Sequence, residues 1–272
     1  MFPYLGLKAS TDQRQIDERL QYHPQVFEFF TTADDVTPAG LAHLRKMIQY
    51  VQATGIEKIV IHHPMKFGAT HNEVSVNPKN HPEQYAFMMQ SSQDLIDLAI
   101  STDTQLLIHG AYNSPVTAIL ADYPSIAAAR DAVFKRLDHF RDLGGDHVMF
   151  ENSISPLFNY GDEAIEDRII DHRYRLCFDT SHAFIVLHGD NTGLQRSMAQ
   201  LKSQVVHYHF VDSMGQFHDS LQLGTGAIDW APLKSLCNQA ASNIFEINLK
   251  NQFDSREMRA SYQYLKQSWH LG

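Results

Sequence analysis

The chain has 272 residues, of which 43% are hydrophobic and 19% charged, a balance that is typical of folded globular proteins and excludes long disordered segments. Its formal net charge of -9 argues against a broad nucleic-acid-binding surface, because lysine and arginine supply most non-specific affinity for phosphate backbones. No apolar run approaches the roughly 18 residues of a membrane span. The first residues also lack the layout of a secretory signal, so we expect a cytoplasmic protein.

Short apolar runs alternate with longer amphipathic stretches along the chain, which is the pattern of strand and helix units around a parallel sheet. We expect about eight strands, near residues 4–8, 26–30, 58–62, 105–109, 147–151, 175–179, 205–209 and 243–246. After the second strand, Thr37 and Pro38 predict the start of a helix that Gly55 ends. Near the end of the chain, the spacing of Asp254 and Glu257 predicts a capping box for the last helix.

The number of strands and the lack of an internal linker predict one α/β domain over residues 1–272, folded as a (β/α)8 TIM barrel. An open, doubly wound sheet is the alternative fold. It requires a glycine-rich phosphate-binding turn after an early strand, whereas the segment Gly224-Thr-Gly226 comes late. Cys177 lies inside an apolar run, which predicts a reduced core thiol and a reducing compartment.

Several predicted strands end in a side chain that can bind a metal ion. Three mainly apolar residues lead into one such side chain at His62, His109, Glu151, Asp179 and Glu246, and less regularly at His209. The C-terminal strand ends of a TIM barrel converge on one mouth, so we expect these six side chains to lie close together. A lone buried carboxylate is costly, and a divalent cation removes that cost. Imidazole and carboxylate together favour a transition metal, zinc or manganese in the first place.

Alternatives remain open for single residues of this set. His63 is a competing ligand to its neighbour His62, but His62 has the same offset from its apolar triplet as His109, and strand neighbours face opposite sides. His182 reaches the mouth as a ligand or a substrate contact only if the chain turns sharply after Asp179. Taken one at a time, each histidine has a structural interpretation, and each carboxylate has one as the partner of a barrel lysine or arginine.

Other residues near the strand ends are candidate substrate contacts. Tyr112 and Asn113 lie in a loop at the mouth, where such barrels bind their substrates. Lys8, Lys66 and Arg173 are candidates for holding a hydroxyl or a phosphate group. A bound metal would add local positive charge, so the acidic balance of the chain does not exclude a phosphorylated small molecule.

The segments Leu176-Cys-Phe-Asp-Thr-Ser-His-Ala-Phe184, His209-Phe-Val-Asp-Ser213 and Gly224-Thr-Gly226 resemble the xylose-isomerase-like barrel superfamily. It contains sugar and sugar-phosphate isomerases and epimerases, and also AP endonucleases of the endonuclease IV type. The resemblance runs along most of the chain in strand order. It implies that the shared metal ligands are Glu151, Asp179, His209 and Glu246. It also implies that His62, His109 and His182 match further zinc ligands of the endonuclease-like branch.

The resemblance departs from the endonuclease-like branch just before the Gly-x-Gly turn. That branch places an Asp and a His two residues apart there, as ligands of a third metal. In this chain His218 and Ser220 stand in those places, so a third metal site is in doubt. His218 is then a candidate substrate contact.

Two reactions compete on this scaffold. In an isomerase or epimerase of a small sugar or sugar phosphate, the metal stabilises an enediolate, and Glu151 and Glu246 remove and return a proton. In a zinc-dependent phosphodiester hydrolase, up to three clustered ions generate the attacking hydroxide and Glu151 bridges them. The same residues would serve a dehydratase acting on a small hydroxylated molecule. A metal-binding protein without catalysis is disfavoured, because an open barrel mouth leaves coordination positions free.

The acidic charge and the altered third-metal segment favour the small sugar, whereas the retained His62 and His109 favour the hydrolase. We therefore expect one to three divalent transition-metal ions and a small-molecule substrate, with neither a nucleic-acid nor a membrane partner. Barrels of this kind often pair, so a homodimer is compatible with the sequence.

Overall fold

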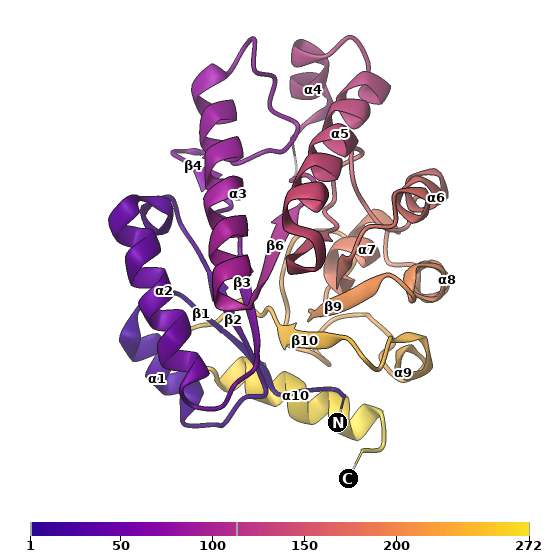
Figure 1. The fold of residues 1–272 in the computed structure, drawn as a ribbon. Coiled ribbons are helices and arrows are strands. Elements are labelled where there is room, and N and C mark those ends of the chain that lie inside the picture. The colour runs from indigo at the N-terminus through magenta and orange to yellow at the C-terminus, as the bar shows by residue number, and fades with distance from the viewer. Residues whose placement is uncertain (1, 113, 272) are drawn as a thin grey trace.

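Parallel strands alternate with helices in the computed structural model, which describes residues 2–112 and 114–271. The strands form one eight-stranded sheet that curls into a nearly closed barrel, with the helices arranged around it (Figure 1). In the order of their neighbours they are β1 (Gly6–Ala9), β2 (Val26–Phe30), β3 (Lys58–His62), β6 (Gln105–His109), β7 (Val148–Glu151), β8 (Leu176–Asp179), β9 (Val205–Phe210) and β10 (Ser242–Phe245). The predicted TIM barrel is therefore confirmed, and the open doubly wound sheet is excluded.

The helices cover the outside of the barrel. They are α1 (Gln13–Leu20), α2 (Pro38–Gln52), α3 (Pro82–Thr102), α4 (Val116–Asp122), α5 (Ile126–Gly144), α6 (Glu163–His172), α7 (Thr180–Val186), α8 (Asn191–Leu201), α9 (Leu233–Leu236) and α10 (Arg256–Ser268). Short 3-10 turns at Asp34–Val36 and Gly145–His147 precede α2 and β7. A small hairpin of β4 (Lys66–Phe67) and β5 (Thr70–His71) rises from the loop after β3. Within the described ranges, none of the helices is long and apolar enough to cross a lipid bilayer.

The helix ends test two local predictions. The Thr37 hydroxyl caps α2 by accepting a hydrogen bond from the Gly40 amide at 3.1 Å, as predicted. The predicted capping box of α10 is wrong, because the N-cap residue is Ser255. Asp254 lies one residue earlier and instead accepts a hydrogen bond from the Arg256 amide at 3.0 Å.

Side-chain hydrogen bonds join the first and last strands of the barrel. The Asn243 amide accepts from the Tyr4 backbone N–H at 2.8 Å and donates to the Tyr4 carbonyl at 3.0 Å. The two strands approach so closely that a Cβ on Gly6 would lie 1.9 Å from the Asn243 carbonyl oxygen. Only glycine fits there, because the atom it would meet belongs to the backbone of the neighbouring strand.

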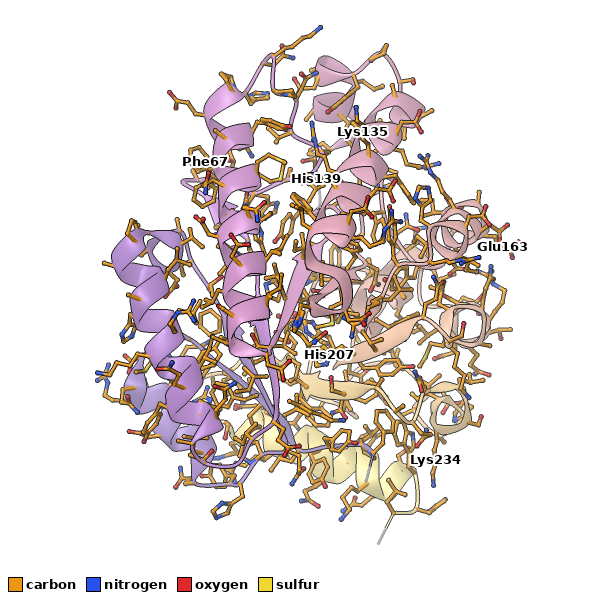
Figure 2. All side chains as sticks on the ribbon, viewed as in Figure 1. Phe67, Lys135, His139, Glu163, His207 and Lys234 are labelled. Carbon is orange, nitrogen blue, oxygen red and sulfur yellow. The ribbon has the colours of Figure 1, made fainter. Side chains whose placement is uncertain are left out.

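The strands bury both faces, as in other parallel sheets. On β2, Phe27 and Phe29 pack into the main hydrophobic core, which is formed with the helices. The interior of the barrel is filled separately, by a small apolar layer of Val60, Leu107, Met149 and Cys177. Figure 2 shows Lys135 and Glu163 on the outer helices and His207 among the strands. Cys177 and Cys237 are both buried and free, in agreement with the predicted core thiol.

Candidate metal centre at the C-terminal mouth of the barrel

The six strand-end side chains meet at the C-terminal mouth. One ligand atom from each of Glu151, Asp179, His209 and Glu246 lies within 4.8 Å of every other in the set. His62 and His109 form a second such group with Glu151, which therefore belongs to both. Glu151 therefore joins the two groups of candidate ligands.

The turn after β8 brings His182 to the same place. Asp179 is the N-cap residue of α7, and its Oδ1 accepts hydrogen bonds from the His182 amide at 2.7 Å and the Ser181 hydroxyl at 2.8 Å. Because the helix starts directly at the strand end, His182 folds back over the mouth, and its Nδ1 lies 3.7 Å from Glu151 Oε1. The sharp turn on which the prediction for His182 depended is therefore present.

Backbone carbonyls fix which nitrogen of two histidines is protonated. The Nδ1 of His62 lies 2.9 Å from the carbonyl oxygen of His63, and the Nδ1 of His182 lies 2.9 Å from that of Asn152. A carbonyl can only accept, so each Nδ1 carries a proton, and in the neutral ring Nε2 is then the nitrogen with the lone pair. This is the arrangement by which proteins usually prepare an imidazole for a metal ion.

Glu151 lies at the centre of the histidines and is fully buried. Its Oε2 is 3.0 Å from His109 Nε2 and 3.5 Å from His62 Nε2, and its Oε1 is 3.1 Å from His209 Nδ1. Burial alone would raise the pKa of Glu151, but His109 and His209 hold it well below its ordinary value. The carboxylate is therefore ionised at neutral pH.

Several buried polar atoms of this cluster have no hydrogen-bond partner among the described residues, namely Glu151 Oε2, Asp179 Oδ2, His62 Nε2 and His109 Nδ1. His109 Nε2 lies 3.0 Å from Glu151 Oε2 but makes no aligned hydrogen bond to it. His62 Nε2 and Glu151 Oε2 face each other at 3.5 Å without a hydrogen bond, and a cation bound between them would satisfy both atoms. The donor set of imidazole nitrogen and carboxylate oxygen fits a divalent transition metal.

For Glu246, the structure contains the salt bridge to a barrel lysine that was the alternative to metal binding, and the lysine is Lys8. Its ammonium group contacts Glu246 directly and lies 3.2 Å from Glu28 Oε1. Burial alone would raise the pKa of Glu246, but Lys8 and His209 hold it far below its ordinary value. Glu246 is therefore ionised without a metal, while Glu151 and Asp179 have no such lysine or arginine partner among the described ion pairs.

His209 is surrounded by acidic groups. Burial alone would lower its pKa, but Cys177 and the carboxylates of Glu28, Glu151 and Glu246 raise the pKa well above its ordinary value. Its Nδ1 lies 2.7 Å from Glu246 Oε2. Without a metal the ring is therefore protonated on both nitrogens, and a cation would displace the Nδ1 proton.

A pocket of about 650 Å³ opens above the cluster. Four of the predicted substrate contacts line it, namely Lys8, Tyr112, His182 and His218, together with Lys66. The rings of His182 and His218 stack with their centroids 4.9 Å apart. Asn113 lies outside the described residues. The suggestion that Arg173 contacts the substrate is wrong, because Arg173 ends α6 just before β8 and so lies at the opposite end of the barrel.

His63 points away from the mouth. Its Nε2 lies 3.0 Å from the Ser91 hydroxyl and 3.1 Å from the Ser92 hydroxyl, both on α3. His62 is thus the member of the pair that faces the cluster. Burial first, and then repulsion from His62 and His109, lowers the pKa of His63 to about 3.

This shift predicts a contribution of His63 to acid sensitivity. In the unfolded chain a histidine titrates near pH 6.5, so between about pH 3 and 6.5 the unfolded state binds a proton that the folded state does not. The free energy of unfolding therefore decreases as the pH is lowered through this window. Relative to a His63→Gln variant, the wild type is expected to lose about 1.4 kcal/mol more per pH unit between about pH 6 and pH 4. Urea unfolding at a series of pH values measures this, and parallel pH profiles would contradict it.

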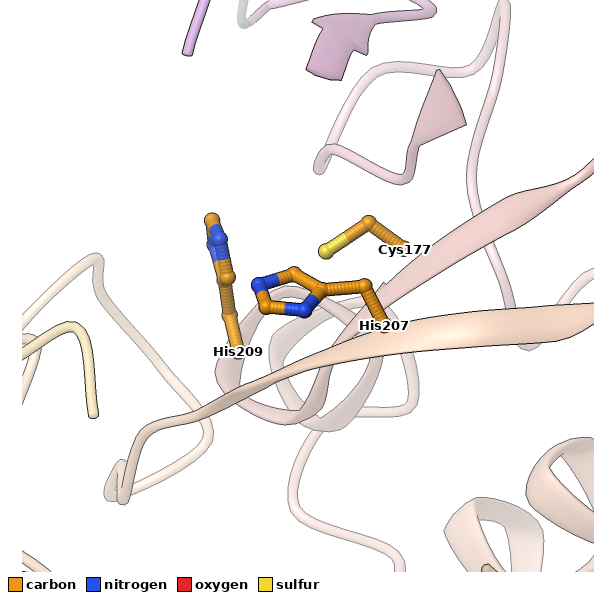
Figure 3. Close-up of side chains that lie close together, drawn as sticks. All are labelled: Cys177, His207 and His209. Atoms are coloured by element: carbon orange, nitrogen blue, oxygen red, sulfur yellow. The ribbon is translucent and has the colours of Figure 1, made fainter. Parts of the chain in front are cut away.

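Sequence reasoning missed two buried polar residues beneath the mouth. Glu28 lies in the middle of the apolar strand β2, and His207 precedes His209 by two residues on β9. Figure 3 shows His207, His209 and the Cys177 sulfur pointing into the same space, and one ligand atom from each lies within 4.8 Å of the others. The available signal was a lone glutamate within the segment 26–30, which otherwise reads as core.

The Gly224-Thr-Gly226 segment has a structural explanation. The buried carboxylate of Asp212 accepts hydrogen bonds from the backbone N–H groups of Gly224 at 2.8 Å and Ile228 at 3.2 Å, and from Trp230 Nε1 at 3.2 Å. A Cβ on Gly226 would lie 2.3 Å from Asp212 Oδ1. These contacts hold the loop after β9 beside the pocket.

Comparison with known proteins agrees with this architecture. The xylose isomerase-like TIM barrel family matches residues 26–268. A D-tagatose 3-epimerase-like protein is 15% identical, with 97% of this chain and 96% of that chain covered and a TM-score of 0.69. An L-ribulose 3-epimerase is also 15% identical, with 99% and 96% covered and a TM-score of 0.68.

A Thermus thermophilus protein soaked with ZnCl2 is 18% identical, with 100% of this chain and 99% of that chain covered and a TM-score of 0.64. No curated protein matches the sequence significantly. At these identities the solved structures show a shared fold. The family match covers most of the chain, which therefore belongs to the xylose isomerase-like TIM barrel family.

Proposed function

We propose that the protein is a divalent-metal-dependent isomerase or epimerase of a small sugar or sugar phosphate. The observation that carries this proposal is a set of buried polar atoms of Glu151, Asp179 and His62 that have no hydrogen-bond partner in the described part of the chain and lie below a pocket that Glu246 lines. The names of the related epimerases support the same substrate class. A bound ion would polarise a carbonyl or hydroxyl oxygen of the sugar.

Glu246 is the proposed proton-transferring group. Its side chain is 25% exposed and lines the pocket, so it can reach the hydrogen on a carbon beside a carbonyl group. Lys8 contacts it and keeps it ionised, as a proton acceptor must be. Removal of this proton gives an enediolate. Its return to the neighbouring carbon, together with transfer of the hydroxyl proton from one oxygen to the other, completes an isomerisation.

Glu151 was the other candidate for proton transfer. It is fully buried beneath the histidines, so we assign it first to metal binding. One carboxylate is sufficient for isomerisation, in which the proton moves between neighbouring carbons on one face. Epimerisation requires a second group on the opposite face, and Glu151 would fill that role only if substrate binding exposes it.

The hydrolase remains a second candidate because of one observation. His62, His109 and His182 all lie near Glu151, more nitrogen ligands than a minimal isomerase site needs. Such a cluster could hold two ions with Glu151 between them, as in enzymes that cleave phosphodiesters.

One experiment separates the two candidates. The protein, loaded with Zn²⁺ or Mn²⁺, is incubated in D2O with a panel of ketoses and ketose phosphates, and NMR follows the loss of the proton beside the carbonyl. In parallel, it is offered an abasic duplex and a simple phosphodiester. The isomerase proposal predicts deuterium incorporation and no cleavage, whereas cleavage without exchange would refute it in favour of the hydrolase.

A further inference from the structure

A buried carboxylate lies beneath the metal centre, and neither candidate reaction uses it. Glu28 is fully buried in the middle of β2. Its neighbours Phe27 and Phe29 pack into the hydrophobic core, so the alternation of the strand turns Glu28 toward the barrel interior. An ionised carboxylate in this position costs free energy unless charged or hydrogen-bonded partners offset the loss of water.

Three side chains supply those partners. Glu28 Oε2 lies 3.0 Å from His209 Nε2 and 3.3 Å from His207 Nε2. Glu28 Oε1 lies 3.2 Å from the ammonium nitrogen of Lys8. His207 is itself held in place, because its Nδ1 lies 2.6 Å from the hydroxyl of Ser242 on the adjacent strand.

The contact with His209 decides how that ring can bind a metal. A carboxylate oxygen only accepts hydrogen bonds, so the Nε2 that faces Glu28 carries the proton. The opposite nitrogen, Nδ1, faces Glu246 Oε2 at 2.7 Å and Glu151 Oε1 at 3.1 Å. His209 thus lies between a carboxylate below and the ligand cluster above.

We propose that Glu28 is a positioning residue, which keeps the His209 proton on Nε2 and so presents the Nδ1 lone pair to the metal centre. The same carboxylate holds Lys8 in contact with Glu246. One oxygen of Glu28 also lies within 4.8 Å of ligand atoms of His62 and Glu246. Because Lys8 already engages Oε1 and the two histidines engage Oε2, we assign Glu28 to orienting Glu246 and His209 and not to binding the ion. The inference rests on the metal centre of the proposed function, whichever of the two reactions takes place there.

Zn²⁺ affinity of a Glu28→Gln variant tests this role. The amide has the size of the carboxylate but can also present N–H groups to the ring, so it no longer dictates the tautomer. Loss of such a partner typically weakens metal binding by about 10–100-fold. We expect a fall of that size, measured by competition with a chromophoric chelator, and a changed visible spectrum of the Co²⁺-loaded protein. Glu28→Asp keeps the charge and is expected to bind Zn²⁺ more tightly than Glu28→Gln. If Glu28→Gln does not fold, Glu28→Asp is compared with the wild type instead.

Glu166→Gln is the matched control. Glu166 is also fully buried and accepts hydrogen bonds from the Gly161 amide and the Ser197 hydroxyl, but it belongs to α6 and is neither among the candidate ligands nor in the pocket lining. A purely structural role for Glu28 predicts that both variants lose stability and keep wild-type Zn²⁺ affinity. Positioning predicts weakened Zn²⁺ binding in Glu28→Gln alone.

Two results would overturn the inference. The first is a folded Glu28→Gln variant with wild-type Zn²⁺ affinity and an unchanged Co²⁺ spectrum. The second is an intense thiolate-to-Co²⁺ band in the wild type, because Cys177 would then be a ligand and His209 would face the inner cluster with His207. If the wild type itself bound neither ion, the metal centre and the proposed function would fall, and the inference with them.

Discussion

Glu246→Gln is expected to lower the turnover number by about 10²–10⁴-fold, the usual contribution of a general acid or base. The amide cannot accept the substrate proton, although its oxygen can still face a metal ion and its size is unchanged. Because Glu246 lines the pocket and contacts Lys8 at its edge, we expect the fold to survive. Deuterium incorporation into the best ketose of the panel measures turnover, and the melting temperature reports on the fold.

Glu57→Gln provides the control for this experiment. Glu57 is exposed in the turn before β3, at the end of the barrel away from the pocket, so its loss changes the net charge equally without touching the site. It should keep wild-type turnover. A fully active Glu246→Gln variant would show that Glu246 is not the proton-transferring group.

Glu151→Gln is expected to act on the metal before it acts on the chemistry. Glu151 faces four histidines and is the carboxylate shared by both ligand groups. Loss of its charge should weaken Zn²⁺ binding by more than about 100-fold, the upper end of what an outer-shell partner costs. Calorimetric titration of metal-stripped protein with Zn²⁺ measures the change.

The two glutamate variants should therefore differ in which property they lose, turnover or metal binding. Glu246→Gln should lose turnover even when it is saturated with metal, whereas Glu151→Gln should purify with little metal and regain activity only at high metal concentration. Glu166→Gln again controls for the removal of a buried carboxylate. If Glu151→Gln retained a full complement of metal, the central position assigned to Glu151 would be wrong.

The fold could be predicted because its signals are local and repeated. Each strand is a short apolar run, and the residue that ends the run occupies the same position in β3, β6, β7 and β8. Because the C-terminal ends of parallel barrel strands meet at one face, the meeting of His62, His109, Glu151 and Asp179 could be predicted without their long-range contacts. The capping box of α10 failed because two adjacent residues, Asp254 and Ser255, are both good caps and only the path of the chain selects between them.

The residues that contact the ligand cluster from β1 and β2 could not be predicted from the sequence in the same way. Glu28 and Lys8 meet Glu246 and His209 across a distance of about two hundred residues in the sequence, and nothing local to β1 or β2 indicates that contact. The sequence suggested Lys8 only as a contact for a hydroxyl or phosphate group of the substrate, whereas its main contacts are with two carboxylates. Arg173 was misplaced even though it precedes the predicted strand 175–179, a position that puts it at the N-terminal end of the barrel, away from the mouth.

Elemental analysis of the protein purified without added metal, and again after equilibration with Zn²⁺ or Mn²⁺, tests most directly whether the strand-end side chains enclose an ion. We predict at least one divalent transition-metal ion per chain. A single exchangeable ion would favour the isomerase, and two or three zinc ions would favour the hydrolase. A folded protein that bound no such ion under any of these conditions would contradict the account.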